Sequence, residues 1–384
     1  MQICICRISV EYKKLGDIAT YINGYAFKPE QRGSEGLPII RIQDLTGNAY
    51  DLGYYNGDYP KKIELNDGDV LISWSASLGV YLWNRGKALL NQHIFKVVFD
   101  KVEIDKFYFM YAVEYNLDKM SLKTHGATMK HITKKDFDNV VIPYPDLDYQ
   151  KEISYRLTSL KGIIGKYQEQ LDLLDELIKA RFVEMFGDPK INPYEWKVIN
   201  ISEVLRAKAS NGFFSRRDDY CDDGNVEVLG VVNVVNRMYS QVTDLPRTYA
   251  NEKDIKKFEV KYGDMLFCRS SLVAEGIGKA SIIPEGVQTN ILFECHVIRL
   301  PLDLDKCVPE FLQTLSTTKF FRNQVISKSK TATMTTIGQD GILKTNIILP
   351  PLEKQKEYYN FVKQIDKSRL LSNHSLFLLK SITF

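Results

Sequence analysis

Two stretches of the sequence are rich in basic side chains and contain no acidic residue. Residues 119–135 hold five lysines together with His125 and His131, and residues 319–339 hold three lysines and Arg322. In a chain whose 51 Lys and Arg nearly balance 48 Asp and Glu, such stretches form local positive patches that attract phosphate groups. A solvated basic loop is the alternative for either stretch alone, but the two occupy equivalent places in an internal repeat.

Loops outside these stretches offer side chains that could reach the edges of bases. Arg and Gln suit bidentate hydrogen bonding to guanine and adenine. Loops in which two related halves differ are the best candidates, because readers of different sequences must differ there. Tyr25, Gln31, Trp74, Ser75, Phe213 and Ser270 are uncharged candidates, although Trp74 and Trp83 fit a hydrophobic core better. The acid-free stretches and these loops together give the predicted DNA-contacting basic residues, which are Lys28, Arg32, Arg85, Lys119, Lys123, Lys130, Lys134, Arg216, Arg217, Arg269, Arg322, Lys328 and Lys330.

Motifs for the chemistries that accompany nucleic acids are missing. Asn192-Pro-Tyr194 lacks the second proline of an adenine-methyltransferase segment, and Gly276-Ile-Gly278 lacks the third glycine of a dinucleotide loop. No Gly-x-x-x-x-Gly-Lys-Ser/Thr loop is present, so ATP hydrolysis is not expected. The six cysteines form no C-x-x-C pair, and the five histidines lack metal-ligand spacing. We therefore expect no catalytic residue, no metal and no cofactor in this chain.

The composition is that of an ordinary protein of the cytoplasm. Hydrophobic content is 44%, charged content is 26% and the net charge is only +3, so the total charge does not argue for nucleic-acid binding. Few cysteines indicate a reduced compartment. No apolar run approaches the roughly 18 residues of a membrane span. Residues 1–10 are apolar but lack a cleavage site, so we expect an edge strand or an extension and no signal peptide.

An internal repeat decides the expected architecture. Ala127-Thr-Met and Pro145 with Gln150 recur as Ala332-Thr-Met and Pro350 with Gln355, at one offset (332 − 127 = 350 − 145 = 355 − 150 = 205). Earlier pieces pair at smaller offsets: Asn23-Gly24 with Asn211-Gly212 at 188, and Gly68-Asp69 with Gly263-Asp264 at 195. A preserved order with a growing offset is what insertions in loops produce, so chance similarity is the weaker explanation.

Each half begins with a strand-rich region of mixed α/β type. Short apolar or β-branched runs between Gly, Asn and Asp predict strands at 37–42, 69–73 and 94–99, with counterparts at 226–232, 265–267 and 292–298. Short helices are expected near 107–115 and 310–321.

Each half ends with a long helix. Apolar residues recur after Pro145 at spacings of four and three, which places them in one seam of the coiled-coil type, and Gly187-Asp-Pro189 ends the pattern. The second helix has polar residues, Arg369 and Ser372, at two seam positions. Antiparallel pairing of the helices explains the seams best, and packing of each helix on its own globule is the alternative. The predicted seam residues are Ile153, Leu157, Leu160, Ile164, Leu171, Leu174, Ile178, Val362, Ile365, Leu376 and Leu379.

Taken together and in order, these pieces resemble the DNA-specificity subunit of Type I restriction-modification systems. The resemblance covers nearly the whole chain, and its specificity comes from the duplicated, ordered set. It is carried by Leu15-Gly-Asp-Ile18, Pro38-Ile-Ile-Arg-Ile-Gln43, Gly68-Asp-Val-Leu-Ile-Ser73, Asn91-Gln92, Ile142-Pro-Tyr-Pro145 with Gln150, and Arg181-Phe-Val-Glu-Met-Phe-Gly-Asp-Pro189.

The resemblance implies a division of labour. Two similar target-recognition domains of mixed α/β (α+β) fold each read one part of a split site in double-stranded DNA. Two long antiparallel helices form a coiled coil between them, set the gap and dock two modification subunits. S-adenosylmethionine belongs to those partners, and ATP and Mg²⁺ belong to restriction subunits.

The expected domains are 1–145 and 189–350 for target recognition, with the spacer helices at 146–188 and 351–384. The second helix ends early and is interrupted by polar residues, which predicts weaker or altered docking, and residues 1–10 have no counterpart in the family pattern. Two rival functions remain open: the specificity part of a fused restriction-modification enzyme, and a coiled-coil scaffold that binds only protein.

Overall fold

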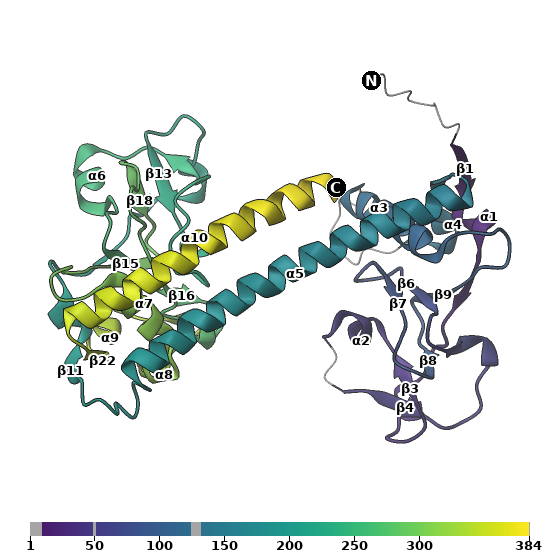
Figure 1. Ribbon diagram of the computed structural model, residues 1–384, viewed down its shortest axis with the longest axis horizontal. Helices are drawn as coiled ribbons and strands as arrows, with labels where there is room; N and C mark the ends of the chain where they lie inside the picture. The colour runs from purple at the N-terminus through teal and green to yellow at the C-terminus, as the bar shows by residue number, and fades with distance from the viewer. Residues whose placement is uncertain (1–9, 49–50, 124–131, 384) are drawn as a thin grey trace. The chain divides into compact units, whose positions relative to one another are not determined.

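The computed structural model describes residues 10–48, 51–123 and 132–383 of the chain. Contacts divide the chain into two compact units, and the boundary between residues 163 and 164 falls inside the long helix α5, Leu147–Phe186. Each unit contains one α/β globule and a length of helix (Figure 1).

The first unit is built on two four-stranded sheets, one antiparallel and one mixed. The antiparallel sheet has the order β2-β9-β6-β7, and the mixed sheet has the order β4-β3-β8-β5 with β3 and β8 parallel. Phe109 of helix α3 and Phe137 of helix α4 are buried in the core of the antiparallel sheet. The elements are β1 Glu11–Lys14, α1 Leu15–Ile18, β2 Thr20–Asn23, β3 Leu37–Ile40, α2 Ile42–Thr46, β4 Gly53–Tyr55, β5 Glu64–Leu65, β6 Val70–Ser73, β7 Gly79–Leu82, β8 Ala88–Leu90, β9 Ile94–Val98, α3 Lys106–Lys123, α4 Lys134–Asp138 and β10 Val141–Tyr144.

The second unit repeats this topology. Its four-stranded sheet has the order β12-β19-β15-β17, and a smaller sheet has the order β14-β13-β18 with β13 and β18 parallel. The elements are β11 Lys197–Asn200, β12 Ser210–Asn211, β13 Val226–Leu229, β14 Arg247–Thr248, α6 Glu252–Phe258, β15 Asp264–Cys268, β16 Ser270–Ser271, β17 Ala280–Ile282, β18 Ile291–Phe293, β19 Val297–Pro301, α7 Pro309–Thr317, α8 Lys319–Ser327, β20 Lys330–Thr331, β21 Thr335–Thr336, α9 Gln339–Leu343, β22 Asn346–Leu349 and α10 Leu352–Thr383.

Single hydrogen bonds repeat as well as whole strands. Gln150 is buried, accepts the backbone N–H of Asp105 at 2.9 Å and donates to the carbonyl of Pro145 at 2.8 Å. Gln355 does the same for Val308 and Pro350, at 2.9 and 2.8 Å. Each glutamine thus fixes the start of a long helix to its own globule, which explains why the motif recurs in the sequence.

The turn that precedes each central strand is also duplicated. Gly68 and Gly263 both adopt positive φ, at 91° and 82°, where a side chain would be strained. The aspartate that follows each glycine pairs with a cation on the neighbouring strand: Asp69 with Lys96 at 2.7 Å, and Asp264 with Arg299 at 3.8 Å. The predicted duplication of one mixed α/β fold is therefore confirmed in strand order, turn geometry and ion pairing.

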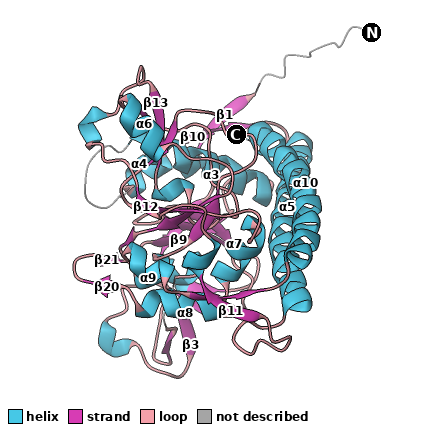
Figure 2. Cartoon of the chain, turned by 90° about the vertical axis from the view of Figure 1, so that its left-hand side faces the viewer, coloured by secondary structure: helices cyan, strands magenta, loops and turns pink. Residues whose placement is uncertain are grey.

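The second half of α5 runs antiparallel to α10, and the two helices lie side by side in both views (Figure 1, Figure 2). Tyr358 near the start of α10 donates to the carbonyl of Ile178 at 3.3 Å, while Arg369, further along α10, forms an ion pair with Asp175. Phe182 and Phe186 pack with Tyr358 and with Phe311 of helix α7. The predicted pairing of the two helices is therefore present in this unit, and both helices also pack on the second globule.

The first half of α5 packs on its own globule. Thr158 shares a hydrogen bond of 2.9 Å with Tyr111, and Lys161 pairs with Glu114 at 2.6 Å, both partners lying on helix α3. Ile153, Leu157 and Leu160 are half-buried on this segment. In the second unit Ile178, Val362 and Leu376 are buried, whereas Ile164, Leu171, Leu174, Ile365 and Leu379 are half-buried.

Two secondary-structure predictions were wrong. The helix predicted near 310–321 is two helices, because Thr318 caps α8 by accepting the N–H of Phe321 at 3.4 Å and ends α7. The strand predicted at 292–298 is two strands, β18 and β19, which belong to different sheets. The apolar residues of 292–298 do not indicate that the chain passes from one sheet to another there, because both strands are buried and therefore apolar.

The predicted edge strand at residues 1–10 lies almost entirely outside the described residues, and β1 begins at Glu11. None of the helices in the described ranges combines the length and the apolar character needed to cross a bilayer.

Candidate nucleic-acid interface

Trp74 and Arg269 occupy the same backbone position in the two globules. Each follows the central strand of its sheet, β6 or β15, and its N–H donates to the carbonyl of a histidine, His93 at 3.3 Å or His296 at 2.9 Å. Their carbonyls accept equivalent N–H groups, those of Ile132 at 3.1 Å and Ile337 at 3.0 Å. Since Ile132 and Ile337 lie within the two acid-free stretches, the fold attaches each basic stretch beside a position whose side chain differs between the halves.

In the second globule this position opens onto a small hydroxyl-rich sheet. Strands β16, β21 and β20 form it, with Ser270 opposite Thr336 and Thr336 opposite Lys330. Nδ1 of His296 lies 3.2 Å from the hydroxyl of Ser270. Arg269 is half-buried and donates through Nη1 to the carbonyl of Cys295 at 3.2 Å. Hydroxyls, a ring nitrogen and basic groups thus gather on one short ribbon, and these are donors that suit phosphate and base edges.

Trp74 has a different role in the first globule. Its ring stacks on Phe95 with centroids 5.5 Å apart, and it packs against the core of the antiparallel sheet of the first unit. The predicted assignment of Trp83 to the core also agrees with its burial, at 2% exposure. In the first half, the segment equivalent to the hydroxyl-rich ribbon is 124–131, which includes Lys130 and His131 and lies outside the described residues.

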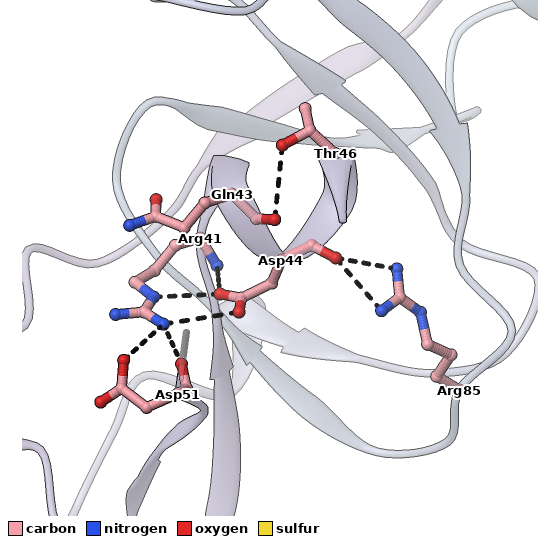
Figure 3. A network of polar contacts seen from close by, with 6 residues as sticks. All are labelled: Arg41, Gln43, Asp44, Thr46, Asp51 and Arg85. Atoms are coloured by element: carbon pink, nitrogen blue, oxygen red, sulfur yellow. Dashed lines mark hydrogen bonds and ion pairs between the residues drawn. The ribbon is translucent and has the colours of Figure 1, made fainter. Parts of the chain in front are cut away.

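Arg85 belongs to a structural network in the first globule (Figure 3). Both terminal nitrogens of Arg85 donate to the carbonyl of Asp44 at 3.2 Å, and its guanidinium lies 4.9 Å from the ring centroid of Trp83. The Asp44 carboxylate accepts the N–H and Nε of Arg41 at 2.8 and 3.0 Å, and Arg41 reaches the carbonyl of Asp51. The side chain of Arg85 is exposed, but these hydrogen bonds occupy some of its donors. A DNA contact of Arg85, as predicted, would use the donors that remain.

The other predicted contacts of the first half are spread over several elements. Lys28 is exposed, while Arg32 is half-buried and packs beside Gly53. Lys119 is exposed with its ammonium 4.1 Å from the ring centroid of Tyr115, and Lys134 pairs with Asp138 at 2.6 Å. Lys123 lies at the end of α3, and its side chain is outside the described set.

In the second half the fold brings Arg269 and Lys330 together on the ribbon but separates the others. Arg216 is exposed at a distant loop, and the side chain of Arg217 is not among those described. Lys328 donates to the carbonyl of Lys344 at 2.6 Å, and burial lowers its pKa. Arg322 faces a cavity beside the helices. Lys328 and Arg322 thus have structural surroundings that the sequence did not indicate.

Two matched lysine pairs were missed by the sequence analysis. Lys61-Lys62 and Lys256-Lys257 are separated by the same offset as Gly68 and Gly263 (256 − 61 = 263 − 68 = 195), and all four lysines are exposed. The carbonyl of the glutamate that follows, Glu64 or Glu259, accepts Lys96 at 2.8 Å or Arg299 at 2.7 Å. Aligning the halves at this offset would have revealed the pairs, which extend the positive surface of both globules.

Comparisons with known proteins agree with this duplicated architecture. The family described as Type I restriction modification DNA specificity domain matches residues 8–173 and again residues 193–376. The chain belongs to this family. The match confirms the resemblance seen in the sequence and with it the predicted class of function, the recognition of DNA in a restriction-modification system.

Curated relatives cover almost the whole chain. The Type I restriction enzyme MjaVIII specificity subunit of Methanocaldococcus jannaschii is 24% identical over 93% of this chain and 86% of its own length. The EcoBI specificity subunit of Escherichia coli is 23% identical over 94% of this chain and 78% of its own length.

Solved structures show the same fold. The S subunit of a Type I restriction-modification system from M. genitalium aligns over 100% of this chain and 96% of its own, with a TM-score of 0.56 and 11% identity. A chain from a study of the assembly and conformational transition of the type I R-M system aligns over 97% and 95%, with a TM-score of 0.52 and 15% identity.

Proposed function

We propose that this chain reads a split DNA site as the specificity subunit of a Type I restriction-modification complex, with one half-site for each globule. The observation that carries the proposal is the shared backbone position of Trp74 and Arg269. Beside matched basic stretches, one copy of the fold has a core-packed tryptophan at this position and the other has a half-buried arginine. A scaffold that only binds protein would have no need to keep this position beside a basic stretch in each half, or to keep the hydroxyl-rich ribbon beside it in the second half.

The paired helices act in this proposal as a spacer and as the docking surface for two modification subunits. Large apolar side chains stay exposed on both helices of the second unit: Leu173 is 57% exposed, Leu370 70%, Leu371 73% and Phe377 69%. An exposed apolar surface of this kind typically marks a protein–protein interface. The study of type I R-M assembly that contains a structural relative supports the same expectation.

Catalysis is assigned to the partners. The sequence lacks the motifs for methyl transfer and ATP hydrolysis, and no cluster of three or more metal-binding side chains occurs among the described residues. The modification subunits would carry S-adenosylmethionine and the restriction subunits ATP and Mg²⁺, all in the cytoplasm. The purified chain alone should therefore transfer no labelled methyl group to DNA, which separates this proposal from a fused enzyme.

Methylome sequencing of cells that contain this chain with its modification subunits tests the proposal. We expect one split methylated motif with a fixed gap. Arg269→Ala should relax base preference at one position of one half-site only, because a bidentate arginine contributes about 1–3 kcal/mol of discrimination. Arg247→Ala is the matched control, since Arg247 is exposed on the same globule away from the ribbon. An unchanged methylome without this chain, or a continuous motif with it, would contradict the proposal.

A further inference from the structure

The second unit contains a cavity of about 860 Å³ between its helices and its globule. One wall comes from α5 and α10, and the other comes from the loop before β17, from residues 236–239 and from helices α7 and α8. This volume lies within the range of pockets that hold small molecules. All the lining residues belong to residues 164–382, so the cavity is a feature of one compact unit.

Three half-buried cations line the globule wall, and none has an acidic partner among the described residues. Arg237 donates to the amide oxygen of Gln241 at 3.1 Å, Lys279 to that of Asn236 at 2.7 Å, and Arg322 to the carbonyl of Glu275 at 2.9 Å. Arg369 on the facing helix differs from these three, because it pairs with Asp366 at 3.2 Å. The globule wall therefore carries uncompensated positive charge.

Two nitrogen atoms of these arginines, both closed off from solvent, are also left without acceptors. Nε of Arg237 and Nη1 of Arg322 are buried atoms with no hydrogen-bond partner among the described residues. Burial lowers the pKa of Arg322. An unpaired buried cation is costly for a fold unless an anion compensates it. Thr314 and Thr317 line the same cavity, but the Thr317 hydroxyl already donates its one proton to the carbonyl of Thr314 at 2.7 Å, so the proposal uses the three cations as its donors.

The helix wall restricts what the anion can be. Asp172, Asp175 and Asp366 line it, and the last two already pair with Arg369. These carboxylates would repel a continuous phosphate backbone, and a space of this size is too small for a duplex. The apolar side chains of Leu171, Ile178 and Met238 also line the cavity and offer contacts to a small organic group.

We propose that this cavity binds a small phosphoryl anion, held by Arg237, Lys279 and Arg322 between the globule and the paired helices. Guanidinium groups match phosphate oxygens bidentately, and an ammonium group adds a point charge. The bound anion would join α8 to the loops at 236–239 and 279 by neutralising the cations on them, while the carboxylates of Asp172 and Asp175 limit its approach to α5. Free inorganic anions and organic phosphate monoesters share this chemistry. The site is separate from the hydroxyl-rich ribbon and independent of the proposed function.

Thermal unfolding and titration calorimetry of the full chain test the site. The probes are inorganic pyrophosphate and adenosine 5′-monophosphate, each compared with sodium chloride at equal ionic strength. A ligand that binds only the folded state raises Tm by mass action, so a rise of several degrees at millimolar probe is expected. Tighter binding of the monophosphate would assign the site to organic phosphates, and tighter binding of pyrophosphate would assign it to inorganic anions.

Arg322→Gln and Lys279→Gln should each weaken binding by about tenfold or more, because each removes a charge-assisted hydrogen bond. Lys344→Gln is the matched control, since Lys344 has a side chain that is 75% exposed and does not line the cavity. Circular dichroism checks that each variant folds. If Arg322→Gln does not fold, the binding measured with Lys279→Gln tests the site. Absence of binding by both probes, or binding unchanged in both variants, would overturn the site. DNA binding that persists in the same preparation would leave the proposed function intact.

Discussion

At the scale of single residues, the most unusual ionisable group is Glu310 on helix α7. It is 1% exposed, and burial raises the pKa of its carboxyl to about 7. The hydroxyl of Tyr239 donates to it at 3.1 Å, and Asp366 on α10 and Glu285 add like charge nearby. The acid therefore lies where the globule meets its helices, and its ionisation opposes their packing.

Replacing Glu310 with glutamine should change how stability depends on pH. The folded-state pKa of about 7 exceeds the ordinary 4.5, so the folded chain binds the extra proton and loses stability as pH rises from about 4.5 to about 7. Glu310→Gln should lack this loss, which is on the order of 3 kcal/mol. Urea unfolding of both proteins between pH 4.5 and 8 measures it. Parallel curves would show that the carboxyl titrates normally.

The basic residues show what sequence can and cannot say at this scale. The acid-free stretches marked Lys328 and Lys330 as equal candidates, yet Lys328 donates to the carbonyl of Lys344 and Lys330 lies exposed on the ribbon. Charge type and spacing are properties of the sequence. The partner that a lysine finds depends on a segment 16 residues away, which only the folded chain brings near.

At the scale of elements, one buried glutamine fixes each long helix to its globule. Gln355→Ala would leave the N–H of Val308 and the carbonyl of Pro350 without their partner in a buried site. Unpaired buried groups cost about 1–3 kcal/mol each, so we expect a loss of roughly 2–5 kcal/mol in the free energy of unfolding. Chemical denaturation measures the loss, with Gln364→Ala as the control because Gln364 is exposed on the same helix. Equal effects would disprove the anchoring role.

The length of α5 gives a second prediction at this scale. Inserting seven residues into the helix between residues 153 and 185 keeps the seam in phase and adds about 10 Å of rise. The gap in the methylated motif should therefore widen by about three base pairs, which correspond to ~3.4 Å each. An insertion of four residues disturbs the phase of the seam and serves as the control. A gap that stays the same after the seven-residue insertion would refute the spacer role.

The polar seam residues of the second helix, Arg369 and Ser372, were expected to weaken or alter the docking of modification subunits. Arg369 instead forms an ion pair with Asp175 on the antiparallel helix, and Ser372 is buried with its hydroxyl bonded to the carbonyl of Ser368. The seam positions are thus compatible with pairing of these helices. Their effect on docking of modification subunits stays a prediction.

At the scale of the whole molecule, the duplicated topology predicts modular reading. Exchanging residues 190–350 for those of a homologue should replace one half of the methylated motif and leave the other half and the gap unchanged. The duplicated glutamine anchors make the exchange feasible, because each globule attaches to its helix through the same bonds. Methylome sequencing of the hybrid measures the result, and changes in both halves would contradict independent globules.

The sequence alone determined the duplication, the two long helices and the mixed α/β class. Those features depend on local periodicity and on repeated motifs, both of which are written in residue order. Tertiary structure decided that Trp74 and Arg269 share one backbone position, that the run at 292–298 divides between two sheets, and that Arg322 faces a cavity. These facts arise from hydrogen bonds and packing between segments far apart in the chain, which no local pattern records.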